Sequence, residues 1–160
     1  MLGIKLICVG KVKEKYYIDA IAEYSKRLGA MCRFEITELS ESRLSDSPSE
    51  KEIEAALEKE SRDIEKAIPA GAYVVAMCIE GRLMSSTEMA ELLSNCAGQG
   101  KSRICFIIGG SVGMHERIKA MSDVRISMSK MTFPHHLARV MLTEQIYRGF
   151  MINEGTKYHK

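Results

Sequence analysis

Three short segments hold residue types that could bind a ligand, and each follows an apolar stretch typical of a β-strand. They are residues 80–82 (EGR), residues 109–113 (GGSVG) and residues 129–134 (SKMTFP). Glycines let a backbone approach a ligand closely and adopt positive φ. Ligands collect at the carboxyl ends of strands in open α/β sheets. We therefore expect the binding site at the ends of these strands.

The glycine-rich segment matches no nucleotide-binding fingerprint. The first strand ends in the single Gly10 without a GxGxxG pattern, and no Gly-Lys-Ser/Thr follows Gly113 as it would in a P-loop. Ser111 lacks the GxSxG surroundings of a hydrolase nucleophile, and no cysteine has an evident histidine partner. By itself, GGxxG also fits a tight turn ahead of a helix.

The C-terminal region supplies further candidates. His135 and His136 follow Pro134 at the start of a predicted helix, where a histidine is usually a surface or capping residue. The closing residues 157–160 (KYHK) are basic and include one aromatic side chain. Such tails are commonly disordered. However, tyrosine, histidine and lysine also suit base stacking and phosphate contact.

Strand-like and helical patterns alternate along the chain. Apolar runs rich in Ile, Val, Phe and Cys predict strands over residues 3–9, 32–38, 72–79, 103–108 and 124–128. The apolar spacing in residues 17–28 predicts a first helix, and residues 134–153 are predicted to form the last one. Between them, two capping boxes each predict the start of a helix: one at Ser47, with Pro48 in the first turn, and one formed by Ser85 and Glu88. This alternation predicts one α/β domain, residues 1–160, with a mostly parallel sheet flanked by helices.

The last predicted helix is apolar around nearly its whole circumference. A helix of this kind is buried on more than one side. In so small a domain one side faces the sheet, so we expect the other to face a second copy in a homodimer.

Composition excludes several classes. With 160 residues, 46% hydrophobic and 28% charged, the chain has an ordinary soluble balance. We expect no membrane span, because no apolar stretch approaches the roughly 20 residues that a span needs. We also expect no signal peptide, because the short apolar N-terminus runs into a Lys-rich segment without a small-residue cleavage site. Five cysteines without a CxxC pair are expected to be buried, reduced thiols of a cytoplasmic protein. No cluster of cysteine and histidine at ligand spacing is present, so we expect no metal site.

Charge is unevenly distributed although the net value is only +2. Residues 1–33 carry seven basic and three acidic side chains (+4), residues 34–68 carry five and eleven (−6), and residues 125–160 carry six and two (+4). A polyanion would be drawn to both ends of the chain and repelled by the middle. A solvated acidic helix between ordinary basic surfaces fits the same pattern equally well.

Taken together, these segments resemble a known family. The residues that carry the likeness are the run 106–113 (FIIGGSVG), the run 127–135 (SMSKMTFPH), Arg139-Val140, Glu144-Gln145, Tyr147-Arg148 and Tyr158-His159-Lys160, with support from residues 4–11 and 79–82. They are similar to the ribosomal RNA large subunit methyltransferase H family of SPOUT methyltransferases. The likeness covers the whole chain, and its C-terminal motif is the specific part.

This resemblance implies a homodimer with a C-terminal trefoil knot that binds S-adenosylmethionine. The implied reaction is methylation of N3 of a pseudouridine in helix 69 of 23S rRNA, on the assembled 70S ribosome. Carried over to this chain, cofactor contacts fall on Met77, Gly109, Gly110, Met128, Ser129, Lys130, Met131, Thr132 and Phe133.

The proton on N3 must leave before or during methylation, and four residues are candidates to assist. His135 and His159 have the intrinsic pKa of a base near neutral pH, Arg139 suits anion binding, and Tyr158 lies beside His159 in the tail. Two alternatives remain open at this point: another SPOUT methyltransferase that acts on tRNA, and a non-enzymatic α/β module that binds a nucleotide or a ribosome surface.

Overall fold

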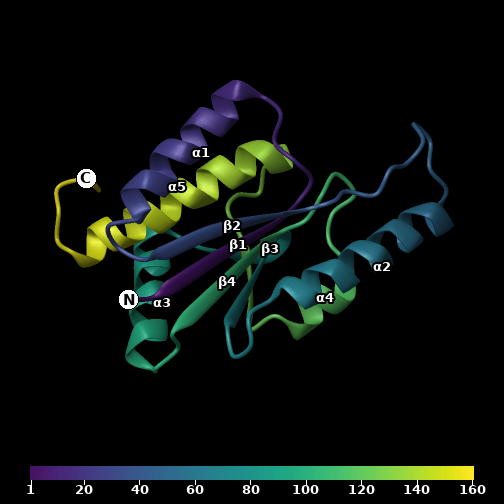
Figure 1. Cartoon of the computed structure of the whole chain (residues 1–160). Coiled ribbons are helices and arrows are strands. Elements are labelled where there is room, and N and C mark those ends of the chain that lie inside the picture. Colours follow the sequence, from purple (N-terminus) through teal and green to yellow (C-terminus); the bar gives the residue numbers. More distant parts are fainter.

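Five parallel strands form one sheet in the computed structural model, which describes residues 1–160 (Figure 1). Their order across the sheet is β2-β1-β4-β3-β5, and all four neighbouring pairs are parallel. The strands are β1 (Gly3–Val9), β2 (Arg33–Leu39), β3 (Tyr73–Leu83), β4 (Arg103–Ile108) and β5 (Val124–Ser127). The predicted parallel α/β sheet is confirmed, with most strand ends within one residue of the expected position.

Only β3 differs substantially from its predicted bounds, because it continues to Leu83 instead of ending at Ile79. Its ladder to β5 shifts register, so that Met77 and Arg82 both lie opposite Ile126. A Cβ atom on Gly81 would lie 2.7 Å from the backbone of Ile126. Glycine therefore permits the close approach of the two strands at this irregularity.

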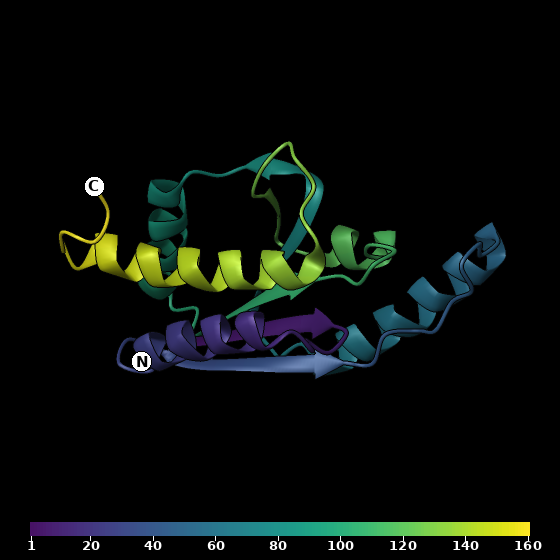
Figure 2. The ribbon, with the colours of Figure 1, turned by 90° about the horizontal axis from the view of Figure 1, so that it is seen from above.

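The helices cover both faces of the sheet. They are α1 (Lys15–Leu28), α2 (Glu50–Ala67), α3 (Ser86–Gly98), α4 (Glu116–Met121) and α5 (His135–Asn153). Core residues from α1, α3 and α5 pack on one face, and residues from α2 and α4 pack on the other. In Figure 2, α5 runs alongside α1 while α2 extends away from the rest of the molecule. No helix has the length and apolar character needed to cross a membrane.

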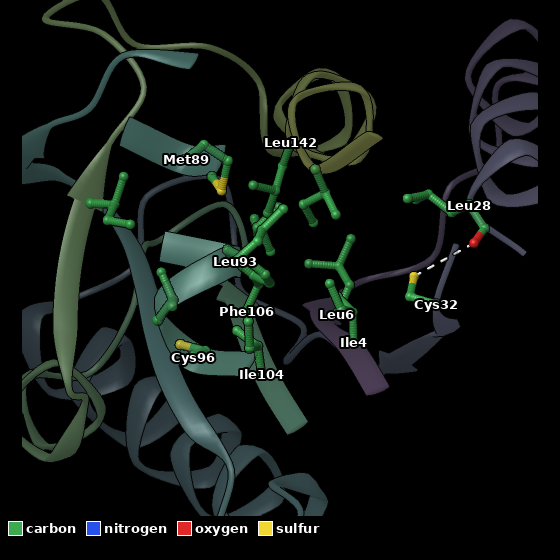
Figure 3. Packing of buried hydrophobic residues seen from close by; sticks show 14 of the residues in the cluster. Ile4, Leu6, Leu28, Cys32, Met89, Leu93, Cys96, Ile104, Phe106 and Leu142 are labelled. Atoms are coloured by element: carbon green, nitrogen blue, oxygen red, sulfur yellow. Dashed lines mark hydrogen bonds between the residues drawn. The ribbon is translucent and has the colours of Figure 1, made fainter. Parts of the chain in front are cut away.

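Alternation along the strands divides the core into two layers. In β1, Ile4, Leu6 and Cys8 belong to the larger cluster, which includes side chains of α1, α3 and α5, whereas Ile7 and Val9 belong to the cluster beneath α2 and α4. Figure 3 shows the larger cluster at close range. This period of two is what a strand buried on both faces requires.

Helix starts follow their side-chain caps. The Ser85–Glu88 box is confirmed at α3. The prediction that α2 is capped by Ser47, with Pro48 in the first turn, is wrong: Ser49 is the N-cap and exchanges hydrogen bonds with Glu52. Ser47 and Ser49 each have a glutamate three residues later in the sequence, but only Ser49 and Glu52 form the two reciprocal hydrogen bonds of a capping box.

Helix α4 was not predicted from the sequence. It has six residues, too few for an apolar period to stand out. His115 caps it, because its Nδ1 atom accepts a hydrogen bond from the amide of Arg117 at 3.0 Å.

All five cysteines are free, and four of them are buried. Burial raises the pKa of Cys8 to about 12 and that of Cys105 to about 12, so both remain thiols at neutral pH. The expectation of buried, reduced cysteines is confirmed for these four, while Cys78 is partly exposed.

Candidate functional site

A cavity of about 350 Å³ opens at the carboxyl ends of β3, β4 and β5. Its walls come from the strands themselves, from the glycine-rich segment and the 128–133 loop that follow β4 and β5, and from residues near α4 and in the first turn of α5. Residues 80–82 do not follow β3 as predicted but lie within it, and of these three only Glu80 lines the cavity. The lining residues are Met77, Cys78, Ile79, Glu80, Ile108, Gly109, Gly110, Gly113, Met114, Lys119, Ile126, Ser127, Met128, Ser129, Met131, Thr132, Phe133, His135 and Ala138. The neighbouring positions of the three strands in the sheet therefore bring these segments together.

The glycine-rich segment forms a tight turn against itself. The amide of Gly113 donates to the carbonyl oxygen of Gly110 at 3.0 Å. A Cβ atom on Gly109 would lie 2.4 Å from the Gly113 carbonyl oxygen, closer than real Cβ atoms come. Position 109 therefore requires glycine for the turn to form this wall of the cavity.

The loop over residues 128–133 makes no backbone–backbone hydrogen bond. Two side-chain bonds shape it: the Ser127 hydroxyl donates to the Ser129 carbonyl oxygen at 2.8 Å, and the Met131 amide donates to the Ser129 hydroxyl at 3.0 Å. The remaining amides and carbonyls of this loop have no partner in the chain. They are free to bind a polar ligand at the cavity wall.

Eight of the nine expected cofactor-binding residues line this cavity. The exception is Lys130, which is exposed and does not contribute to the lining. Sequence reasoning missed Lys119, because it lies on the unpredicted α4. Lys119 forms an ion pair with Glu80, and this hydrogen bond holds the pKa of Glu80 below its ordinary value. The position of Glu80 after a strand was the only sequence signal for this pair.

His135 is the one candidate catalytic residue that lines the cavity. Its side chain is 22% exposed, and its Nε2 atom is buried without a hydrogen-bond partner. Burial, followed by the neighbouring charges of His136 and Arg139, lowers the pKa of His135, although Glu41 and Glu14 oppose the shift. The ring is therefore neutral at physiological pH.

Arg139 is buried and does not line the cavity. The guanidinium is only 2% exposed, and its Nη1 atom lies 2.5 Å from the Glu38 carboxylate. Its Nη2 atom donates to the carbonyl oxygen of Gly10 at 3.0 Å. These bonds tie α5 to the ends of β1 and β2.

Tyr158 and His159 lie at the far end of α5 from His135. The Tyr158 hydroxyl donates to the Glu144 carboxylate at 3.0 Å, and the Nδ1 atom of His159 lies 3.2 Å from an Arg148 guanidinium nitrogen. The 19 residues of α5 span about 28 Å. The tail of a chain is thus separated from the cavity of the same chain by the length of this helix.

Between α2 and α4, the structure brings together Glu54, Glu58 and His115, whose ligand atoms lie within 4.8 Å of one another. The Nδ1 atom of His115 accepts from the Arg117 amide, so in the neutral ring Nε2 carries the proton. That proton faces Glu54 at 3.0 Å. The His115–Glu54 hydrogen bond therefore links α4 to α2.

Comparison with known proteins gives one consistent result. Residues 2–159 match the family described as "Predicted SPOUT methyltransferase". Proteins from Streptococcus uberis and Clostridium beijerinckii, both called Ribosomal RNA large subunit methyltransferase H, are each 48% identical over 159 residues, which cover 99% of this chain and 100% of theirs.

Two solved structures share the fold at low sequence identity. A probable methyltransferase from Bordetella pertussis Tohama I has a TM-score of 0.61 at 12% identity, over 93% of this chain and 95% of that chain. A probable methylase family protein from Haemophilus influenzae Rd KW20 has a TM-score of 0.57 at 15% identity, over 100% of this chain and 72% of that chain. The chain therefore belongs to the ribosomal RNA large subunit methyltransferase H family of SPOUT methyltransferases.

Proposed function

We propose that this protein transfers a methyl group from S-adenosylmethionine to N3 of a pseudouridine in helix 69 of 23S rRNA, on the assembled 70S ribosome in the cytoplasm. One observation carries the proposal. The glycine turn and the 128–133 loop enclose a single cavity, in a chain 48% identical over its length to proteins called Ribosomal RNA large subunit methyltransferase H. Residues 1–160 serve this activity as one domain.

The cavity suits this cofactor in size and in chemistry. A volume of about 350 Å³ lies in the range of small-molecule sites. Apolar side chains such as Met77, Ile108 and Phe133 suit an adenine ring, and the free backbone groups of residues 128–133 suit its nitrogens and the ribose. When bound, S-adenosylmethionine supplies a methyl group already activated by its sulfonium charge. Met77, Gly109, Gly110 and residues 128–133 would hold it.

The chain's own task is to orient the base and take up a proton. We assign His135 to the proton, because it lines the cavity and its neutral ring can accept. Arg139 would hold the first turns of α5 in place through Glu38 and Gly10. Tyr158 and His159 would contact the RNA or the base at the site of a second subunit, because α5 separates them from the cavity of their own chain.

A homodimer is therefore part of the proposal. Leu137, Val140 and Met141 are apolar, half-buried residues of α5 that belong to neither core cluster. Val140 and Met141 also line a second cavity of about 470 Å³ beside α3. A second copy packed on this face would cover these side chains and bring its tail towards the first cavity.

The trefoil knot implied by the family belongs to the proposal as well. The path of the chain after β5 supports it. Strand β5 lies at one edge of the sheet, and the 128–133 loop leads from it back across the sheet to α5, which packs against α1 and α3.

Transfer of a labelled methyl group to intact 70S ribosomes, taken from a strain that lacks the enzyme, tests the function. We expect S-adenosylmethionine-dependent labelling of one 23S rRNA position that increases as salt is lowered, because RNA binding by basic surfaces is salt-sensitive. Labelling of tRNA instead of ribosomes would point to another SPOUT activity. If calorimetry detects no binding of S-adenosylmethionine, the chain is a non-enzymatic module and the proposal fails.

A further inference from the structure

Glu41 connects two walls of the cavity although it does not line it. It lies in the loop after β2, in a polar stretch without secondary structure. Its Oε1 atom accepts hydrogen bonds from both the amide and the hydroxyl of Ser111, at 2.9 and 2.6 Å. Ser111 is the central residue of the glycine turn. A side chain from a distant loop thus anchors that turn.

The second carboxylate oxygen of Glu41 faces the first turn of α5. Oε2 lies 3.7 Å from the buried Nε2 atom of His135. The space between them adjoins Gly10, where a Cβ atom would come within 2.8 Å of Oε2 and 3.5 Å of the His135 nitrogen. Glycine at position 10 thus leaves room for the carboxylate and the imidazole to approach each other.

The Glu41 carboxylate is an anion at neutral pH. Partial burial pushes its pKa up, but the hydrogen bonds from Ser111 and the attraction of His135 and His136 lower the pKa overall. A carboxylate anion can only accept hydrogen bonds. The neutral ring of His135 is therefore most stable with its proton on Nε2, towards Glu41, which leaves the lone pair on Nδ1.

The Nδ1 atom of His135 is the accessible nitrogen of the ring. It makes no hydrogen bond within the chain, and of the two ring nitrogens only Nε2 is fully buried. The ring lines the cavity. An unprotonated, accessible Nδ1 atom at the wall of the cavity is a suitable proton acceptor for a bound base.

We infer that Glu41 is a positioning residue for the methyl transfer: it anchors the glycine turn through Ser111 and orients His135 so that Nδ1 accepts the proton of the substrate base. The inference rests on the proposed function for the identity of that base. In the step, the N3–H bond breaks and its proton passes to Nδ1. The N3 electron pair forms the bond to the methyl carbon, while the carbon–sulfur bond breaks and its electrons remain on sulfur. The Glu41 anion stabilises the imidazolium that results.

Several charges face His135 and together set its titration. Glu41 approaches from the loop after β2 and Glu14 from the segment before α1, and both favour the protonated ring. His136 and Arg139 lie on α5 itself and oppose protonation. Replacing Glu41 by glutamine removes one of the two favourable charges. The pKa of His135 should therefore fall further, by about one unit.

Nuclear magnetic resonance of the histidine rings tests the geometry without cofactor or ribosome. In the wild-type protein, ¹⁵N shifts of the neutral His135 ring should report the Nε2–H tautomer. In Glu41→Gln the titration of His135 should move down by about one pH unit, and the tautomer preference should weaken. Glu54→Gln removes a carboxylate that faces another histidine, His115, and should leave His135 unchanged. Identical titration of His135 in the wild type and Glu41→Gln, or a dominant Nδ1–H tautomer, would overturn the inference.

Methyl transfer to 70S ribosomes tests the consequence. In Glu41→Gln, kcat should fall about tenfold with little change in KM, and the acidic limb of the pH–rate profile should move down by about one unit. Ser111→Ala cuts the hydroxyl bond to Glu41 but keeps the anion beside His135, so its acidic limb should stay in place. If Glu41→Gln lowers kcat without moving the limb, Glu41 is merely structural and the inference fails. The resonance experiment still reports on the pairing if the substrate proves to be a different RNA.

Discussion

Removing Glu38 should destabilise the fold more than removing Arg139, although the two residues form one ion pair. The guanidinium is 2% exposed, whereas the Glu38 side chain is 37% exposed. Arg139 Nη1 lies 2.5 Å from the carboxylate, and that same carboxylate oxygen accepts a hydrogen bond from the Val12 amide at 3.0 Å. If Glu38 is removed, the guanidinium that remains is therefore shielded from water. If Arg139 is removed, the carboxylate that remains is already partly hydrated.

The structure allows the two costs to be compared. Glu38→Ala leaves a buried guanidinium without its counter-ion, which costs about 3–5 kcal/mol. Arg139→Met leaves a carboxylate that water reaches and that keeps the Val12 amide, and the methionine refills the space of the arginine stem. We expect a loss of only about 1–2 kcal/mol in that variant. The two variants should thus differ by about 2 kcal/mol in free energy of unfolding.

Urea unfolding followed by circular dichroism measures this difference. At equal slopes, the midpoint for Glu38→Ala should lie well below that for Arg139→Met. The thermal midpoints should differ by about 4–8 °C, because 1 kcal/mol corresponds to roughly 2–4 °C in a chain of this size. If Arg139→Met is the less stable of the two, the guanidinium does not depend on Glu38 for its burial and the reasoning is wrong.

Three further outcomes are expected. Gly109→Ala should weaken S-adenosylmethionine binding in calorimetry at least tenfold, because its Cβ atom would lie 2.4 Å from the Gly113 carbonyl oxygen. Gly98→Ala is the control and should bind normally, because no atom lies within 4 Å of the Cβ position there. The lowered pKa of His135 favours the neutral ring in the folded state. The contribution of His135 to stability is therefore complete above pH ~6.5 and is lost as the pH falls through the folded-state pKa. Urea midpoints should drop over that pH interval in the wild type, and His135→Gln should remove this drop. Val140→Glu should sediment as a monomer and lose methyl transfer, and an active monomer would contradict the dimer proposal.

Local chemistry made much of the fold predictable. The period of two in β1 places Ile4 and Leu6 opposite Ile7 because successive side chains of a strand point to opposite faces. The Ser85–Glu88 box marks the start of α3 because its partners lie within one turn. The same local rule misplaced the start of α2, because two serines had suitable glutamates and spacing alone did not distinguish them.

From residue types and spacing alone we could predict the parallel α/β class, the positions of its strands, and the glycine-rich and 129–134 segments that line the cavity, since each depends on neighbours a few residues apart. The folded structure was needed to show that Arg139 is buried in an ion pair, that Lys130 does not line the cavity and that β3 continues past its expected end. It alone also brought Glu41 to Ser111, across 70 positions of the chain. Such contacts arise from how strands order themselves in the sheet and how loops cross its edge, and no short-range pattern of residue types encodes that order.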